Sequence, residues 1–280
     1  MRGSADIDRR IDALVARQRG PMAVAVWAAG AAGRPWYVRD ARAAYPAASV
    51  IKVAYLVELF AAHAGGLDAP LPGIDAVLDD ARHPALAPFS ARQRADIRRA
   101  LRGASVRRIG AIMMARVGAA NHVYNAAANV VTAVLGGPRG LTRRIRARAA
   151  AFAPIAVRRY MLAARARGDN TTSAAALGAV VQGLAAARLR GVDGRTARAM
   201  QEAVRLRPQR AGGVHRAKSG YLPSAPVVSA FCGWWRRGRR AVVYVVMASA
   251  PRPARGPRDP LPATARRIRD LVLRHARTAR

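Results

Sequence analysis

Ser49-Val50-Ile51-Lys52 is the most informative stretch of this chain, together with Lys218-Ser219-Gly220 nearer the C-terminus. Lys52 and Lys218 are the only lysines among 49 lysine and arginine residues. Arginine stands almost everywhere that a cation is needed, so the two lysines mark positions where arginine does not serve. An arginine cannot give up its proton in a protein, whereas a lysine can act as a base once burial or a neighbouring cation lowers its pKa. We therefore expect both lysines to take part in chemistry.

The spacing of the first motif suits nucleophilic catalysis. A serine hydroxyl is a weak nucleophile until a base takes its proton. Lys52 follows Ser49 by three residues, which places both side chains on the same side of a helix. The two motifs together use every lysine of the chain. Two stray surface lysines are therefore the weaker interpretation.

The composition is that of a globular protein. The chain has 280 residues, 52% of them apolar, and is long enough to bury a full core. Its one cysteine, Cys232, excludes an internal disulfide and is expected to be a buried filler in a strand. No apolar stretch is long enough to span a membrane. Residues 1–6 lack an apolar signal region, so we expect a cytoplasmic protein, or a periplasmic or secreted one if a signal was removed.

The formal charge of +34 raises the question of a nucleic-acid partner. The arginines are scattered through every segment, however, and no zinc pattern, RNP-type strand or helix-turn-helix signal is present. We therefore expect only a non-specific, salt-sensitive affinity for polyanions.

Apolar periodicity predicts strands near both ends of the chain and helices between them. Strands are expected at 22–28, 35–39, 215–220, 227–235 and 241–248, with a Gly-rich turn at 30–33 and a charged hairpin turn in the run 234–240. Helices are expected at 5–18, at 50–63, after Ser90, after Ser105, at 126–135, at 174–189, at 197–206 and at 263–278. Residues 64–89 are expected to form a Gly/Pro/Asp-rich connection and 149–170 to be irregular, and Gly136-Gly137-Pro138 is expected to end a helix.

This order of elements predicts an α/β (α+β) fold, in which an antiparallel sheet is flanked by the terminal helices and accompanied by an all-α lobe. We expect one domain over 1–280, with an α/β lobe of about 1–48 and 207–280 and a helical lobe of about 49–206. The two lysine motifs then fall where the two lobes are expected to meet, which is a usual place for a cleft.

The motifs resemble those of the class A β-lactamases and penicillin-binding proteins, a superfamily of active-site serine enzymes. Besides the S-x-x-K and K-[ST]-G motifs, residues 125–129 and 135–142 are similar to the family's helix after its S-D-N motif. Residues 170–173 resemble the end of the family's omega loop. The resemblance covers nearly the whole chain and implies a serine β-lactamase-like fold with no cofactor and no metal.

The resemblance also implies a role for each site residue. Ser49 attacks an amide or ester carbonyl, Lys52 takes its proton, and the backbone N–H groups of Ser49 and Tyr221 hold the oxyanion. Asn125 binds the substrate amide and helps to hold Lys52, while the K-[ST]-G motif binds a substrate carboxylate. The expected catalytic residues are Ser49, Lys52, Asn125 and Lys218, and the expected substrate-binding residues are Ser219, Gly220, Tyr221 and Tyr124.

Two departures from the family pattern bear on turnover. The S-D-N motif here is Val123-Tyr124-Asn125, so the hydroxyl that relays a proton to the leaving nitrogen is missing. Tyr124 either supplies a hydroxyl from the neighbouring position or packs as a buried ring. His122 is a second candidate relay, although a lone histidine is more often structural.

The second departure is the missing omega-loop glutamate, which activates the deacylating water in class A β-lactamases. Met161 or Tyr160 lies near its expected place. Asp169 is the only acid of this segment and is expected to pair with a nearby arginine, and Glu58 is expected to form an ordinary ion pair.

These features predict a serine hydrolase that acts through an acyl-enzyme and deacylates β-lactams poorly. The expected partner is a small-molecule or peptide substrate, either a β-lactam or a D-Ala-like amide or ester, and the protein is expected to be a monomer. Two alternatives stay open. One is a D,D-peptidase or esterase-like enzyme, and the other is a degenerate, non-catalytic homologue that binds a peptide or a polyanion.

Overall fold

The structure is a computed structural model that describes residues 5–18, 20–28, 35–166, 168–207, 212–252 and 260–278. The chain forms two compact units. The first, called the sheet unit below, comprises Met1–Ile51, Thr171–Ala186 and Leu206–Arg280. The second, called the helical unit, comprises Lys52–Asn170 and Ala187–Arg205. The helix after residue 173, which the sequence placed with the helical lobe, thus belongs with the sheet.

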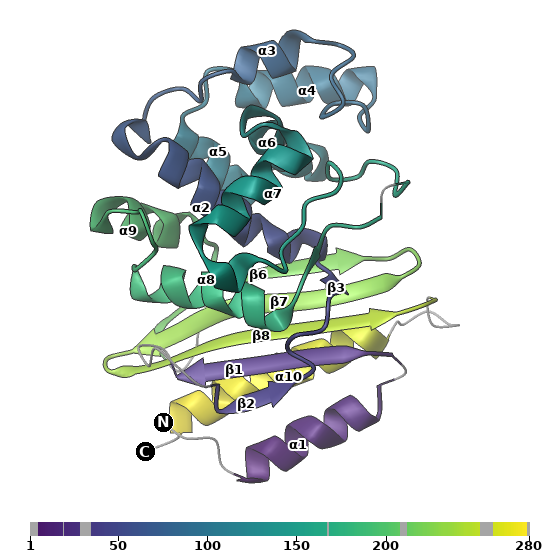
Figure 1. The fold of residues 1–280 in the computed structure, drawn as a ribbon, viewed down its shortest axis with the longest axis vertical. Helices are drawn as coiled ribbons and strands as arrows, with labels where there is room; N and C mark the ends of the chain where they lie inside the picture. Colours follow the sequence, from purple (N-terminus) through teal and green to yellow (C-terminus); the bar gives the residue numbers. More distant parts are fainter. Residues whose placement is uncertain are drawn as a thin grey trace. The chain divides into compact units, whose positions relative to one another are not determined.

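The sheet unit is built on six antiparallel strands in the order β2-β1-β8-β7-β6-β5 (Figure 1). The strands are β1 (Met22–Ala28), β2 (Tyr37–Arg39), β5 (Leu206–Arg207), β6 (Val214–Leu222), β7 (Val227–Arg237) and β8 (Arg240–Ala250). A separate two-stranded pair joins β3 (Tyr45–Pro46) to β4 (Thr171–Thr172). The expected fold class, an antiparallel sheet with flanking terminal helices and an all-α part, is confirmed.

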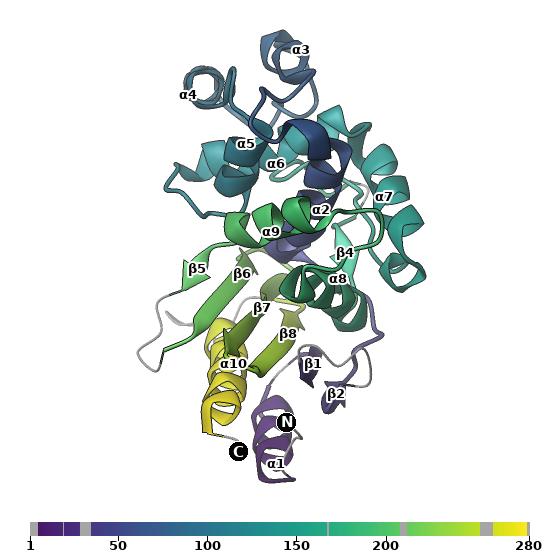
Figure 2. The ribbon, with the colours of Figure 1, turned by 90° about the vertical axis from the view of Figure 1, so that its left-hand side faces the viewer.

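Helices cover both faces of the sheet. The terminal helices α1 (Ala5–Ala16) and α10 (Pro260–Thr278) lie on one face, and α8 (Ala174–Ala186) lies on the other (Figure 2). Side chains alternate along β1, so Val24 and Val26 join the core beneath the terminal helices while Trp27 points to α8. A Cβ at Gly178 would lie 2.1 Å from the Trp27 ring, so only glycine lets α8 approach this closely. Double coverage explains why β1 and β8 are apolar almost throughout.

The helical unit is organised around α2 (Lys52–Ala62), which is buried on nearly every side. Four helices pack on it, namely α5 (Val106–Met113), α6 (Asn121–Val134), α7 (Gly137–Arg148) and α9 (Gly194–Ala203). Two further helices, α3 (Ile74–Asp79) and α4 (Ala91–Leu101), pack on α6. No helix in the ranges that the structure describes is both long and apolar enough to cross a membrane.

Most elements fall where the apolar pattern predicts them. Ser90 and Ser105 cap α4 and α5, Ser173 caps α8 through the Ala176 N–H, and Cys232 is buried in β7. The expected charged hairpin joins β7 to β8, with Gly238 at a φ of 56°. The expected turn at 30–33 lies outside the described residues.

Three local predictions were wrong. The helix expected at 126–135 starts at Asn121, and the connection at 64–89 contains α3. The sequence Gly136-Gly137-Pro138 ends α6 but also begins α7, which was missed. Gly136 has a left-handed φ of 94°, which ends α6, and a proline in the first turn is compatible with a new helix because its missing N–H has no partner there.

Candidate active site

Ser49 lies in a short 3-10 turn, η1 (Ala48–Ile51), which leads directly into α2. Ala48, just before it, has a φ of 46°, a left-handed conformation that is strained for a residue with a Cβ. Such strain persists only where the surroundings over-determine the backbone. The backbone at Ser49 is therefore held firmly in a turn.

Strand β6 brings the second lysine motif to this turn within the sheet unit. A Cβ on Gly220 would lie 2.6 Å from the Ser49 nitrogen and 3.0 Å from the Val50 nitrogen, so a glycine is needed for η1 to lie against β6. Lys218 is two residues earlier and shares the face of Gly220, because side chains alternate along a strand. Lys218 is buried, and its Nζ donates to the Ser219 carbonyl at 2.6 Å. Tyr221 is 48% exposed.

Lys52 is the first residue of α2, and its side chain is 0% exposed. Its Nζ donates to Asn125 Oδ1 at 2.9 Å and approaches the backbone oxygen of Tyr124 at 3.5 Å. The same Nζ lies 3.3 Å from the centroid of the Tyr124 ring. One turn of α6 therefore surrounds the ammonium group with two oxygens and a ring face.

The amide of Asn125 is oriented by a residue that the sequence analysis missed. Asn125 Nδ2 donates to the Asn121 backbone oxygen at 3.0 Å and to Asn121 Oδ1 at 3.1 Å. Because the amide nitrogen is used in this way, Oδ1 points at Lys52. The signal in the sequence was the series Asn121, Asn125 and Asn129, which recurs every four residues along one face of a helix.

Val123 and His122 are positions on α6 at which the sequence raised the question of a proton relay. Val123 is buried and has no hydroxyl. His122 Nε2 lies 3.4 Å from Asp96 Oδ2 on α4, which agrees with the structural interpretation of this histidine.

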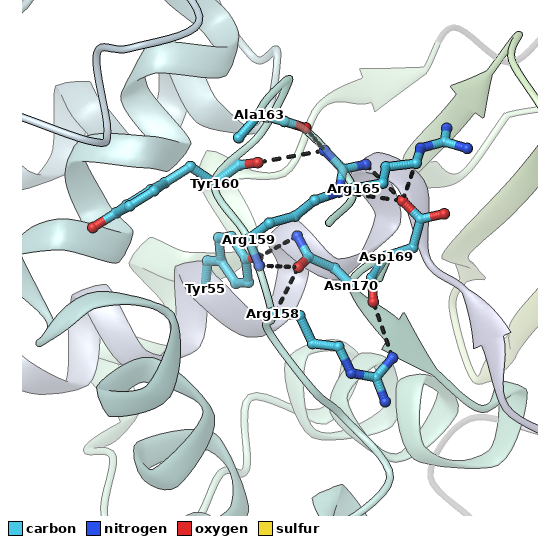
Figure 3. Close-up of polar contacts among 8 residues, drawn as sticks. All are labelled: Tyr55, Arg158, Arg159, Tyr160, Ala163, Arg165, Asp169 and Asn170. Carbon is cyan, nitrogen blue, oxygen red and sulfur yellow. Dashed lines mark hydrogen bonds and ion pairs between the residues drawn. The ribbon is translucent and has the colours of Figure 1, made fainter. Parts of the chain in front are cut away.

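The segment 158–170 is closed into a loop by Asn170 (Figure 3). Asn170 Oδ1 accepts hydrogen bonds from the backbone N–H groups of Arg158 at 2.8 Å and Arg159 at 3.0 Å, so it joins the two ends of the loop. Its Nδ2 donates to the hydroxyl of Tyr55 on α2 at 3.3 Å. Burial raises the pKa of the Tyr55 phenol well above its usual range, so the hydroxyl stays protonated. The loop is thus anchored to the central helix.

Asp169, the only acid in this loop, is engaged by two arginines (Figure 3). Its Oδ1 lies 2.6 Å from Arg159 Nη2 and 3.2 Å from Arg165 Nε, and the side chain is 9% exposed. The expectation that Asp169 pairs with an arginine is therefore confirmed. Both arginines contact the same oxygen of this carboxylate.

Both backbone polar groups of Met161 bond to the buried side chain of Asn129. Asn129 Oδ1 accepts from the Met161 N–H at 2.6 Å, and Asn129 Nδ2 donates to the Met161 carbonyl at 3.1 Å. The same Nδ2 also donates to the Ala85 carbonyl oxygen at 2.9 Å. The buried side chain at this fixed position is a thioether, which cannot act as a base at physiological pH.

Glu58 forms the ion pair that the sequence led us to expect. Arg148 Nε lies 2.6 Å from Glu58 Oε1, and Arg148 Nη2 lies 3.0 Å from Glu58 Oε2. Arg148 Nη1 also donates to the Arg190 carbonyl at 2.6 Å. This bidentate pair joins α2 to α7 and is structural.

No protein-family model matches the sequence, and no curated protein matches it. Solved structures, in contrast, are similar over nearly the whole chain. The class A β-lactamase from Mycobacterium abscessus is 16% identical with a TM-score of 0.70, and the match covers 96% of this chain and 98% of that one.

The chain has the class A β-lactamase fold. The class A β-lactamase of the last common ancestor of Gram-negative bacteria is also similar, with 17% identity, a TM-score of 0.70 and coverage of 96% and 99% of the two chains. PBP-A is 17% identical with a TM-score of 0.68, covering 96% and 95%. The structural similarity establishes the fold, whereas identities this low do not establish the activity. In the described residues, no group of three or more His, Cys, Asp or Glu is placed to hold a metal ion.

Proposed function

We propose that the protein is a serine hydrolase that forms an acyl-enzyme on Ser49. The Ser49 hydroxyl proton passes to the neutral amine of Lys52 as Oγ attacks an amide or ester carbonyl carbon. The backbone N–H groups of Ser49 and Tyr221 hold the oxyanion of the tetrahedral intermediate. Collapse of the intermediate breaks the bond to the leaving nitrogen or oxygen, which takes up the proton from Lys52.

The environment of Lys52 is the observation that supports this proposal most directly. Lys52, three residues after Ser49, is completely buried, and its Nζ donates a hydrogen bond to Asn125 Oδ1 at 2.9 Å. A lysine, unlike an arginine, can release and take up a proton in a protein, which is what a base requires. A long cationic side chain is rarely buried without a function or a partner. The chain keeps lysine here although it uses arginine at nearly every other basic position.

Deacylation is proposed to be slow. Hydrolysis of the acyl-enzyme needs a water and a base within hydrogen-bond reach of it. In the loop 158–170, the one carboxylate, Asp169, is engaged by Arg159 and Arg165, and Met161 stands at the position that Asn129 fixes. The proposed substrates are β-lactams or D-Ala-like amides and esters, whose carboxylate Lys218 and Ser219 would bind.

Mass spectrometry after incubation with a panel of penicillins, activated D-Ala esters and a fluorophosphonate tests the proposal. We expect a covalent adduct on Ser49 that is absent from Ser49→Ala, and burst kinetics with nitrocefin, in which about one equivalent of product is followed by a slow steady state. An adduct that forms equally in Ser49→Ala contradicts the proposal. Rapid linear turnover without a burst contradicts the slow deacylation alone.

Two alternatives make different predictions for the same panel. A D,D-peptidase or esterase turns over the D-Ala esters while β-lactams stay bound, and the similarity to PBP-A keeps this candidate open. A non-catalytic homologue gives no adduct with any reagent, and the missing hydroxyl at Val123 favours it.

We also propose a non-specific affinity for polyanions. The net charge of +34 motivates it, and counterion release makes such binding fall steeply with salt. Fluorescence titration with DNA of unrelated sequences in increasing salt measures it. A complex with one sequence that persists in high salt would instead indicate a specific nucleic-acid function.

A further inference from the structure

The contact between Lys52 and Tyr124 has no counterpart in the roles that the sequence resemblance implies for either residue. Nζ lies over the ring at 3.3 Å from its centroid, in the geometry of a cation–π interaction. Tyr124 therefore presents the negative face of its π-system to Lys52. The phenol oxygen lies in the plane of the ring, to the side of this contact.

The other groups that α6 presents to Nζ have the same electrostatic character. Asn125 Oδ1 at 2.9 Å and the Tyr124 backbone oxygen at 3.5 Å are both acceptors, and Asn121 fixes the amide so that its oxygen rather than its nitrogen faces Lys52. Two oxygens and a ring face attract an ammonium more strongly than a neutral amine. This turn of α6 is thus shaped for a cation in a place from which water is excluded.

We propose that Tyr124 is a positioning residue, and that the face of its ring, rather than its hydroxyl, holds the Lys52 side chain and stabilises the ammonium that forms when Lys52 takes the Ser49 proton. The inference rests on the proposed function in its catalytic consequence, although the contact itself does not depend on catalysis. It differs from a proton relay, in which the hydroxyl is essential and the ring serves only as its support.

The chain offers an unusually clean spectroscopic test, because it contains only two lysines. In protein labelled with 13C-lysine, each lysine gives one set of side-chain signals, and Lys218→Arg assigns them. A ring face above Lys52 shifts its ε-methylene protons upfield. We expect this shift in the wild type and in Tyr124→Phe, and its loss in Tyr124→Leu. Wild-type signals without an upfield shift would overturn the proposal without the use of any variant.

The kinetic arm compares the two variants in fluorophosphonate labelling of Ser49. Phenylalanine keeps the ring face and leucine removes it, so Tyr124→Phe should label faster than Tyr124→Leu by about three- to thirtyfold, the range of a cation–π interaction. Thermal melting shows that both variants are folded. Equal rates in the two variants would overturn the inference, because the hydroxyl or simple packing would then explain the role of Tyr124.

The two arms also separate this inference from the proposed function. Equal labelling of wild type and Ser49→Ala means that the proposed function fails, while the methylene shift still reports on the Lys52–Tyr124 contact. An upfield shift together with the expected difference between Tyr124→Phe and Tyr124→Leu supports both.

Discussion

At the scale of single residues, Lys52 differs from every other basic residue of the helical unit in being a lysine. Its Nζ is completely buried and fits between Asn125 Oδ1 and the Tyr124 ring. A guanidinium would keep the charge, but it would be larger and would never release a proton. Charge alone therefore does not explain why this position is a lysine.

We expect Lys52→Arg to lower the rate of Ser49 labelling by at least about a hundredfold, the scale of a missing general base. Stopped-flow or gel-based labelling with a fluorophosphonate measures the rate. The matched control is the reverse exchange at the exposed Arg108, where Arg108→Lys should label like the wild type. Labelling of a folded Lys52→Arg variant at the wild-type rate would show that Lys52 is not the base.

At the scale of elements, the helical unit is held together by polar contacts as well as by its apolar core. The Glu58 side chain on α2 is 4% exposed, and Arg148 on α7 contacts both of its oxygens. Removal of one partner of such a pair leaves a charge buried without compensation. The pair is therefore costly to break, whatever its net contribution compared with an apolar pair.

We expect Arg148→Ala to lower the free energy of unfolding by about 3–5 kcal/mol. Urea unfolding followed by circular dichroism measures the loss. Arg107→Ala is the matched control, since Arg107 pairs with the highly exposed Asp68 and solvent screens this pair. Similar losses in the two variants would mean that burial does not determine the strength of these pairs.

The loop 158–170 is the second element with a distinct prediction. Asn129 fixes both backbone polar groups of Met161, so a side chain introduced there starts from a defined position. We expect Met161→Glu to speed the release of the penicilloyl adduct by about a hundredfold, the lower end of what a general base contributes. Intact-protein mass spectrometry over time follows the adduct. Met161→Gln controls for shape and polarity, and equal release in the Glu and Gln variants would argue against a water-activating position.

At the scale of the whole molecule, the sheet unit contains a buried histidine that links stability to pH. His215 on β6 lies 2.9 Å from the Tyr244 hydroxyl. Burial, and then the nearby Arg269, Arg207 and Arg277, lower the pKa of His215 to about 3. The unfolded chain, whose histidine titrates near its ordinary value, therefore binds a proton more readily at mildly acid pH. Stability is lost as the pH falls below about 6.5.

We expect the wild type to lose about 2–3 kcal/mol more unfolding free energy than His215→Gln when the pH falls from 7 to 4.5. Urea unfolding at the two pH values gives the difference. The repulsion among the many arginines acts equally on both proteins and cancels in this comparison. Parallel losses in the two proteins would show that His215 titrates normally in the folded state.

The sequence by itself determined the class of the fold and the residues of the proposed chemistry. Ser49, Lys52 and Lys218 stand out from local spacing and from the scarcity of lysine. Apolar periodicity located the sheet and most helices, because a strand or helix must turn its apolar residues toward the core. Local signals failed at the start of α6 and at the short helix α3, and at Gly136-Gly137-Pro138, which ends α6 and begins α7.

Only the tertiary structure decided which distant residues meet. Asn129 and Met161 are 32 residues apart, and Glu58 and Arg148 are 90 apart. The sequence around either residue of such a pair does not indicate its partner, because the pairing depends on how the helices pack. The same holds for the close approach of Gly220 to Ser49 and for the Tyr124 ring above Lys52. Local chemistry therefore named the reactive groups, while packing determined which groups position them.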